Sequence, residues 1–154
     1  MIRVLAILAA YGALTSAENP TYRACGNTTM NDIFKQIFGE HGWQVKTCCD
    51  AVLKAEELVK RYLDNNVKVT TYKGNWCVKT AKRHSNSGPQ HAGDGARQLF
   101  LSIDESIEYL KKADKNREVG CATDCKMRNT EESRQHECAL VCLIELKNGE
   151  TCRK

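Results

Sequence analysis

Three stretches of the chain repeat their apolar residues every three or four positions, the period of an α-helix that buries one face. They span residues 29–42, 47–66 and 96–115. Stripes of this kind are usually packing faces, so we expect three helices packed side by side. The stripes are formed by Met30, Ile33, Phe34, Ile37 and Phe38, by Cys48, Val52, Ala55, Val59 and Tyr62, and by Leu99, Ile103, Ile107 and Leu110.

The pattern changes between residues 67 and 95. Alternate residues from Val67 to Thr71 are apolar or β-branched, a turn follows at Gly74-Asn75, and apolar residues resume at Trp76. This arrangement predicts a small β-hairpin in the centre of the chain. The polar stretch that follows, "RHSNSGPQHAGDG" at residues 83–95, predicts a surface loop.

The stretch "GCATDCKMRNTEESRQHECALVC", residues 120–142, holds two cysteine pairs with the same spacing. Residues four apart share a face of a helix, so Cys121 and Cys125 would point one way, as would Cys138 and Cys142. In an antiparallel pair of helices over 121–127 and 131–147, facing residues have a constant index sum. That sum is 263 for both Cys121–Cys142 and Cys125–Cys138, which predicts two nested disulfides.

The ends of the second predicted helix carry matching signals. Asn129 and Glu132 have the spacing of a capping box at its start. Asn148-Gly149 has the composition of a helix end. The same cysteines suit other chemistry less well, because zinc sites usually contain CxxC knuckles and redox motifs contain CxxC beside a βαβ unit.

The CxxxC–linker–CxxxC spacing of residues 121–142 resembles that of the plant α-hairpinins and the helical-hairpin scorpion potassium-channel toxins. The resemblance covers this stretch only. It implies the same disulfide pattern on a helical hairpin and, more weakly, a toxin-like role. With the helices upstream, the expected fold is mainly α: a disulfide-stapled bundle of four to five helices with a C-terminal antiparallel helical hairpin and the small central β-hairpin.

The N-terminus has the features of a secretory signal peptide. Residues 1–17 contain one basic residue, Arg3, then an apolar run too short to span a membrane, and small residues at Thr15 and Ala17. We therefore expect residues 18–154 to form one secreted, extracellular domain with no membrane span. Without Arg3 the chain has 22 basic and 19 acidic residues, and a net charge of +3 is too small to indicate binding to nucleic acid.

Secretion passes the nine cysteines through an oxidising compartment, where we expect them to form disulfides. Outside the hairpin, five remain, and an odd number in a secreted protein suggests a disulfide-linked homodimer. Cys48, on its apolar stripe, is expected to bridge within the domain, with a different partner from the adjacent Cys49. The others are Cys25, Cys77 and Cys152, of which the last two, like Cys49, are expected near the surface.

No pattern in the sequence indicates catalysis, so we expect a protein that is not an enzyme and that has no cofactor or metal. The four histidines, His41, His84, His91 and His136, are scattered and form no HExxH. The stretch "TCCDAV" weakly resembles the CCxxHDxC helix of secreted phospholipases A2. Asp50 is present, but the histidine that would act as base is missing.

A small carrier of a hydrophobic ligand is one alternative. The spacings of Cys121–Cys125 and Cys142–Cys152 resemble fragments of the cysteine pattern in insect odorant-binding proteins. However, the order of the intervals differs. Aromatic residues make up 6% of the chain and leave little material to line a large cavity.

The leading hypothesis is a secreted, disulfide-rich binding effector, either toxin-like or a signalling ligand, that acts on an extracellular receptor, channel or host protein. A basic cluster with interleaved aromatic residues is the candidate contact surface. The alternative is an ordinary solvated face with Trp76 in the core. The cluster consists of Lys68, Tyr72, Lys73, Trp76, Lys79, Lys82 and Arg83. In addition, Asn27-Thr28-Thr29 is a glycosylation sequon, which predicts a glycoprotein modified at Asn27.

Overall fold

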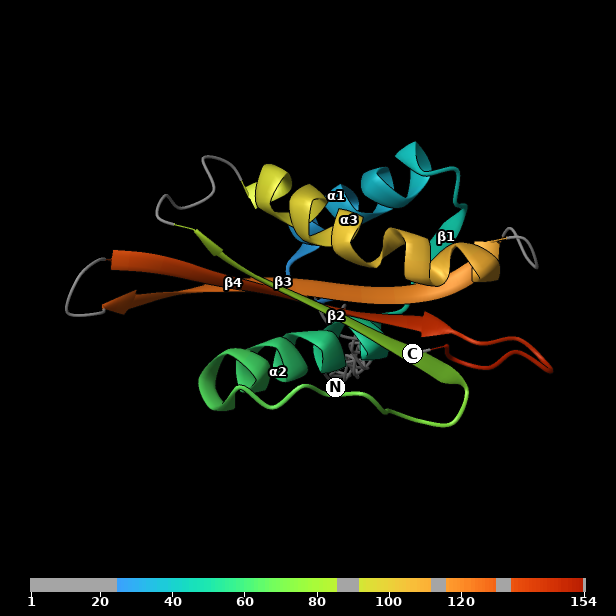
Figure 1. Ribbon diagram of the computed structural model, residues 1–154. Coiled ribbons are helices and arrows are strands. Elements are labelled where there is room, and N and C mark those ends of the chain that lie inside the picture. The colour runs from blue at the N-terminus through green and yellow to red at the C-terminus, as the bar shows by residue number, and fades with distance from the viewer. Residues whose placement is uncertain (1–24, 86–91, 112–115, 130–133, 154) are drawn as a thin grey trace, which may run out of the picture.

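A computed structural model describes residues 25–85, 92–111, 116–129 and 134–153. The predicted signal peptide and His91 lie outside these residues. The described residues form three helices and four strands, arranged in three layers (Figure 1). Helices α1 (Thr28–Glu40) and α3 (Ala92–Lys111) cover one face of the sheet, and α2 (Cys49–Asn65) covers the other.

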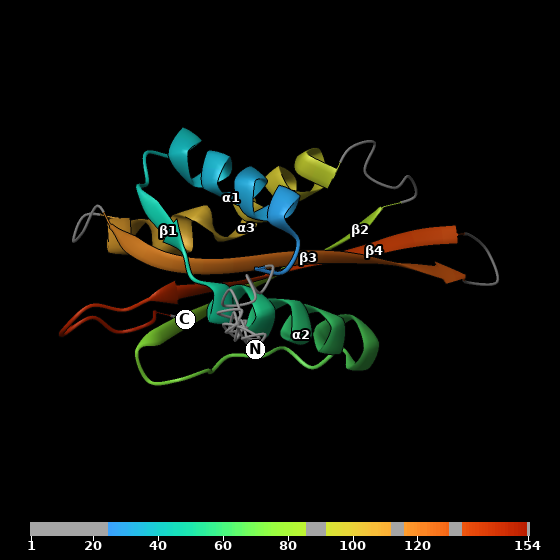
Figure 2. The ribbon, with the colours of Figure 1, turned by 180° about the vertical axis from the view of Figure 1, so that it is seen from behind.

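The sheet has the strand order β1-β3-β4-β2. The short strand β1 (Val45–Thr47) runs parallel to β3 (Arg117–Asn129), and β4 (Arg134–Glu145) pairs antiparallel with both β3 and β2 (Trp76–Ser85). Strand β1 lies at one edge and leads the chain from the layer of α1 to α2 on the opposite face (Figure 2). Strand β2 forms the other edge.

The predicted mainly α bundle is wrong, because residues 120–129 and 134–142 lie on the paired antiparallel strands β3 and β4. Cys121 pairs with Cys142 and Cys125 with Cys138 in the β3–β4 ladder, so the register is the one given by the index sum of 263. A constant index sum describes any antiparallel pair. Residues four apart share a face in a strand as well as in a helix, since four is even. The cysteine spacing therefore could not distinguish the two structures.

The continuous apolar run "CALVCLI" at residues 138–144 indicates a buried strand. It lies on β4, where every residue from Cys138 to Ile144 is buried. Leu140, Cys142 and Ile144 pack towards α1 and α3, whereas Val141 and Leu143 pack towards α2. A central strand covered on both faces has a continuous apolar run, not an alternating one. The predicted cap residue Glu132 lies outside the described residues.

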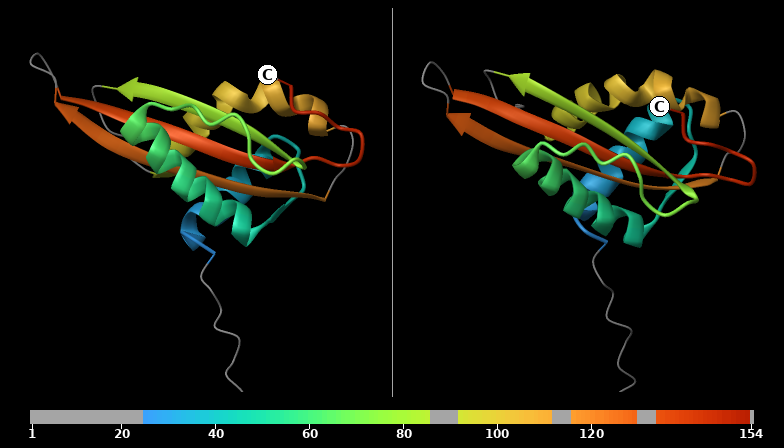
Figure 3. Two further views of the ribbon diagram at one scale, coloured as in Figure 1. Left: turned by 90° about the horizontal axis from the view of Figure 1, so that it is seen from below. Right: turned by 60° about the horizontal axis from the view of Figure 1, so that its bottom comes forward.

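The predicted central hairpin is also wrong. Only its second half is a strand, and that strand pairs with β4, from Trp76 opposite Glu145 to Ser85 opposite His136. The segment 66–75 runs back beside α2 to the start of β2 without forming a strand (Figure 3). The predicted loop 83–95 is shorter than expected, because residues 83–85 end β2 and residues 92–95 begin α3. Residues 86–91 lie outside the described residues.

The three helices predicted from periodicity are present, and their stripes form two cores. The first core lies between the sheet and α1 and α3, where Phe38 meets Phe100 and Trp43 in edge-to-face contacts with ring centroids 4.9 and 5.6 Å apart. The second lies between the sheet and α2. There Gly120 allows α2 to approach β3 closely, since a Cβ at this position would lie 2.3 Å from the carbonyl carbon of Ala51.

Candidate binding groove at the edge of the sheet

Four disulfides cross-link the described part of the chain. They join Cys25 to Cys49, Cys77 to Cys152, Cys121 to Cys142 and Cys125 to Cys138. The expectation that Cys48 bridges within the domain is wrong, because Cys48 is the free thiol of the described part of the chain. It immediately precedes α2, and its backbone N–H donates to the carbonyl of Val119, 2.9 Å away. Cys77, expected near the surface, is fully buried.

A groove of about 880 Å³ lies beside β2, at the edge of the sheet. One wall is the segment 68–74, with Tyr72 and Lys73. The opposite wall is formed by Ser102, Ile103 and Ser106 of α3 and by the C-terminal residues 150–153. The first half of β2 forms the floor. Segments far apart in the sequence therefore build this site.

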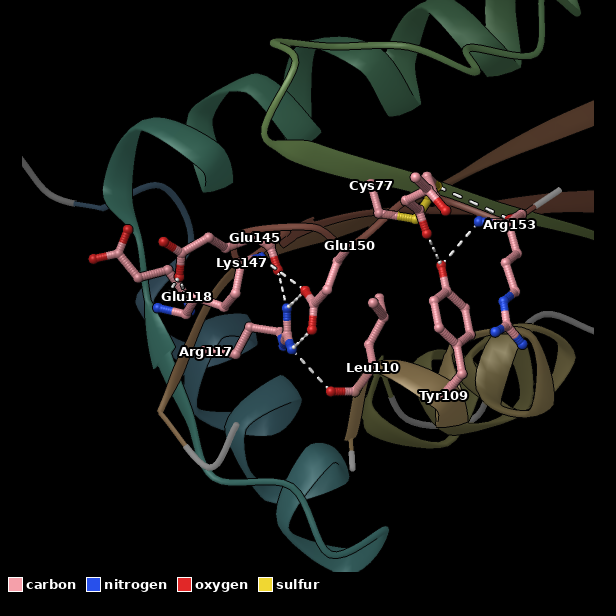
Figure 4. Close-up of polar contacts among 11 residues, drawn as sticks. Cys77, Tyr109, Leu110, Arg117, Glu118, Glu145, Lys147, Glu150 and Arg153 are labelled. Atoms are coloured by element: carbon pink, nitrogen blue, oxygen red, sulfur yellow. Dashed lines mark hydrogen bonds and ion pairs between the residues drawn. A yellow bond between two sulfur atoms is a disulfide. The ribbon is translucent and has the colours of Figure 1, made fainter. Parts of the chain in front are cut away.

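A buried arginine fixes the C-terminal wall of the groove (Figure 4). Arg117 is fully buried, and its guanidinium forms a bidentate pair with Glu150, with Nη1–Oε2 and Nη2–Oε1 distances of 2.6 and 2.7 Å. The same guanidinium donates to the carbonyls of Leu110 and Glu145. These bonds hold the end of the chain against α3 and β4 and neutralise the Glu150 carboxylate.

Two further contacts hold the last described residues (Figure 4). The Tyr109 hydroxyl donates to the carbonyl of Thr151 at 2.9 Å and accepts from the backbone N–H of Arg153 at 2.8 Å. The Arg153 guanidinium lies 4.4 Å from the centre of the Tyr109 ring. The Cys77–Cys152 disulfide ties the same segment to β2. The wall is therefore preorganised, and its residue Arg153 carries a positive charge.

Lys79 in the groove floor carries a charge that no carboxylate in the described part of the chain balances. The residue is 7% exposed, and its ammonium donates to the carbonyl of Arg153 at 2.6 Å. Burial lowers the pKa of Lys79, and the nearby charge of Lys68 lowers it further. Both causes oppose the charged form, so an anion in the groove would stabilise this ammonium.

The opposite wall combines aromatic rings with cations. The rings of Tyr72 and Trp76 lie edge to face with centroids 6.3 Å apart, and the Lys73 ammonium is 5.6 Å from the centre of the Tyr72 ring. Trp76 is half-buried and packs against the core beneath α2, so it serves both the core and the groove. Lys68 and Lys73 form no ion pair with a carboxylate that the structure describes.

The structure divides the basic cluster that the sequence suggested as a contact surface. Five of its members line the groove: Lys68, Tyr72, Lys73, Trp76 and Lys79. Lys82 instead pairs with Glu137 at 2.7 Å and lies over the Tyr62 ring, and Arg83 donates to Gln98 of α3. Arg153 and the two α3 serines were missed, because no local pattern indicates that the C-terminus returns to β2.

Glu137, the partner of Lys82, is a buried carboxylate at the other end of the sheet. Its side chain also pairs with Arg128 of β3. Burial acts to raise the pKa of Glu137, but the hydrogen bonds and charges of Lys82 and Arg128 outweigh it and hold this pKa below its usual range. The carboxylate thus stays ionised and joins three strands and α2, so its role here is structural.

Two smaller hollows combine fewer suitable groups. One of about 450 Å³ contains His41, which lies 2.9 Å from Asp104, and another of about 230 Å³ lies beside Asn27 and Glu56. Within the described ranges, no group of three or more His, Cys, Asp or Glu is placed to hold a metal ion. None of the described helices is both long and apolar enough to cross a membrane.

No known protein family, no curated protein and no solved structure matches this chain. Its class therefore follows from the structure: a disulfide-rich protein with a mixed four-stranded sheet between helical layers and a cationic groove at one sheet edge.

Proposed function

We propose that this protein is a secreted binding effector that captures an acidic segment of an extracellular protein in the groove beside β2. Four disulfides in so small a chain are typical of proteins that fold in an oxidising compartment and act outside the cell. The target class is the acidic part of a receptor, channel or host protein, reached by a toxin-like or signalling ligand.

The observation that carries this proposal is the charge of Lys79, which no carboxylate of the described residues balances. A buried ammonium whose pKa is lowered costs free energy in the unbound protein, and an anionic ligand recovers that cost. Lys68, Lys73 and Arg153 surround the same space, whereas the Glu150 carboxylate is occupied by Arg117. The C-terminal wall is held by a disulfide and an ion pair, so this wall loses little conformational entropy when a ligand binds.

A titration with short acidic and basic peptides of matched length tests the proposal. Trp76 lies in the groove, so its fluorescence should change on binding, and Trp76→Phe identifies the part of the signal that comes from this residue. We expect the acidic peptide to bind and the basic peptide not to bind. Equal binding of both peptides would contradict the proposal.

Charge-removing variants locate the binding site. Lys79→Met and Lys68→Gln should each weaken binding of the acidic peptide at least tenfold. Lys46→Gln is the matched control, because it removes one charge from exposed strand β1 at the opposite edge of the sheet. A loss of affinity in Lys46→Gln as large as that in Lys79→Met would show that net charge, and not the groove, attracts the peptide.

The volume of the groove favours a second candidate, carriage of a small hydrophobic ligand. About 880 Å³ lies within the range of small-molecule sites, and Val69, Tyr72 and Trp76 supply an apolar wall. This function predicts that an uncharged hydrophobic dye binds and that Lys79→Met leaves its affinity unchanged or raised. The effector function predicts that the acidic peptide binds more tightly than the dye.

The expected disulfide-linked homodimer would form through Cys48, the half-buried free thiol. We propose this linkage because four of the five cysteines outside the β3–β4 hairpin pair within the chain. Non-reducing electrophoresis should then show a dimer for the natural protein and a monomer for Cys48→Ser. A natural monomer whose thiol reacts only after denaturation would overturn the dimer.

A further inference from the structure

One edge of strand β2 runs along the groove, and no other strand of the described residues pairs with it. On one side β2 pairs with β4 over its whole length, and in the strand order it is the last member of the sheet. From Cys77 to His84, no backbone group bonds to anything other than β4 within the described part of the chain. Alternate N–H and C=O groups of an edge strand point away from its partner and can accept another strand.

The same edge forms the floor of the groove. Trp76, Val78, Lys79 and Thr80 of β2 all line it. These positions span a strand of roughly five residues, about 17 Å long. The walls on either side would lie against the two faces of a strand added at this edge. Backbone hydrogen bonds and side-chain contacts are thus available to one extended ligand.

We propose that the acidic segment binds as an additional β-strand along the free edge of β2. This inference rests on the proposed function and adds the backbone conformation and side-chain pattern of the partner. Main-chain hydrogen bonds would provide much of the affinity in such strand addition, and the walls would select the side chains.

The side chains on the two faces of β2 determine which side-chain pattern the added strand can have. Cys77 and Ala81 pack towards α1 and α3, so Lys79 shares that face, and it meets the carbonyl of Arg153 there. Val78 and Trp76 pack on the face of α2, beside Tyr72. Opposed residues of neighbouring strands share a face. An added strand therefore has acidic residues towards Lys79 and Arg153 and apolar residues towards Trp76 and Tyr72.

Charge also favours an acidic segment of another protein over a second copy of this chain as the partner. Two copies joined edge to edge at β2 would bring together two sets of Lys68, Lys79 and Arg153, which repel each other. The alternation of acidic and apolar residues matches the groove without this repulsion. The occupant is thus an extended acidic segment of another protein.

The test uses changes in the peptide, which leave the folding of the protein untouched. The probe is the capped peptide EVEVEV, and a capped EEEVVV peptide has the same composition without the alternation. Two further probes carry N-methyl groups on alternate residues, one on the glutamates and one on the valines. A bound strand directs only one of these sets of N–H groups to β2.

We expect one N-methylated peptide to lose at least tenfold in affinity and the other to bind nearly as well as the parent peptide. EEEVVV should also bind at least tenfold more weakly. Hydrogen exchange should show slowed amides at alternate positions of β2 on binding, with those of α2 unchanged. With the Cys48→Ser variant, which cannot form the proposed disulfide-linked dimer, light scattering should show one protein chain in the complex.

The two proposals fail in different ways. Equal binding of both N-methylated peptides, together with a loss of affinity in Lys79→Met, would overturn strand addition and leave acidic-segment binding in place. No binding of any acidic peptide would overturn both proposals. Self-association of the protein through protected β2 amides would overturn the choice of a foreign strand as partner.

Discussion

The guanidinium of Arg117 and the carboxylate of Glu150 form a bidentate ion pair with nitrogen–oxygen distances of 2.6 and 2.7 Å. Arg117 begins β3, and Glu150 follows the last strand. The Arg117 side chain is fully buried, whereas that of Glu150 is 14% exposed. This pair fixes the C-terminal segment, which in turn forms one wall of the groove.

Replacing Arg117 by Met should reduce the free energy of unfolding by about 3–5 kcal/mol, because it removes the cation that pairs with the largely buried Glu150 carboxylate. Chemical denaturation measures the change. The double variant Arg117→Met with Glu150→Gln should lose less than Arg117→Met alone, since it leaves no buried charge behind. A double variant that loses the sum of the two single losses would show that the residues do not act as a pair.

The Cys77–Cys152 disulfide should stabilise the protein more than the Cys125–Cys138 disulfide. The paired residues are 75 positions apart in the first case and 13 in the second. In the chain-entropy model, loops of these lengths correspond to about 4.5 and about 3 kcal/mol. To compare the two contributions, each cysteine pair is replaced by Ala and the free energy of unfolding is measured by denaturation. Only the first replacement should also weaken binding of the acidic peptide, because it releases the C-terminal wall.

Replacing Lys79 by Met should raise the free energy of unfolding, by on the order of 1 kcal/mol, while weakening binding of the acidic peptide. The substitution removes a buried charge that has no carboxylate partner among the described residues. A substitution that damaged the fold would lower both stability and affinity. Opposite changes in the two measurements therefore identify Lys79 as a binding residue.

The affinity for the acidic peptide should also depend on pH through Lys79. Its pKa in the folded protein lies below the unfolded value of about 10.4, so the unfolded state binds more protons between the two values. The cost of the buried charge therefore falls, and stability rises, as pH increases through that window. Peptide affinity should begin to fall at a lower pH in the natural protein than in Lys79→Met.

Replacing Glu137 by Gln should lower the free energy of unfolding by about 3 kcal/mol at neutral pH, because Lys82 and Arg128 lose their buried partner. The pKa of Glu137 is lowered, so its stabilisation is present above about pH 4.3 and is lost as pH falls through the folded pKa. The difference in the free energy of unfolding between the natural protein and Glu137→Gln should therefore become smaller in acid. Denaturation curves at pH 7 and about pH 3 measure it.

Asn27 is placed to be glycosylated without losing its role at the start of α1. Its side-chain oxygen accepts from the backbone N–H of Met30 at 3.1 Å, and the residue is exposed. A glycan attaches to the amide nitrogen, so the oxygen can still cap the helix. A glycosidase should reduce the mass of protein secreted by eukaryotic cells, and an unchanged mass would contradict this prediction. Asn27→Ala should cost about 1 kcal/mol.

The sequence by itself determined the three helices and the register of the C-terminal cysteines. A helix that buries one face has apolar residues every three or four positions, as Leu99, Ile103 and Ile107 are in α3. This pattern can be recognised without knowing which element the helix packs against. The register followed from the positions of four cysteines, because an antiparallel pair has a constant index sum whatever its secondary structure.

Only the tertiary structure decided that these cysteines lie on strands and that β2 pairs with β4. The spacing of Cys121 and Cys125 fits one face of either element, and Val141 lies in a strand that is buried on both sides only because α2 and α3 cover it. The groove depends on the same long-range contacts. Lys79 was identified from the basic residues around it in the sequence. Its burial depends on Arg153 and Cys152, which contact β2 although they lie more than seventy residues further along the chain.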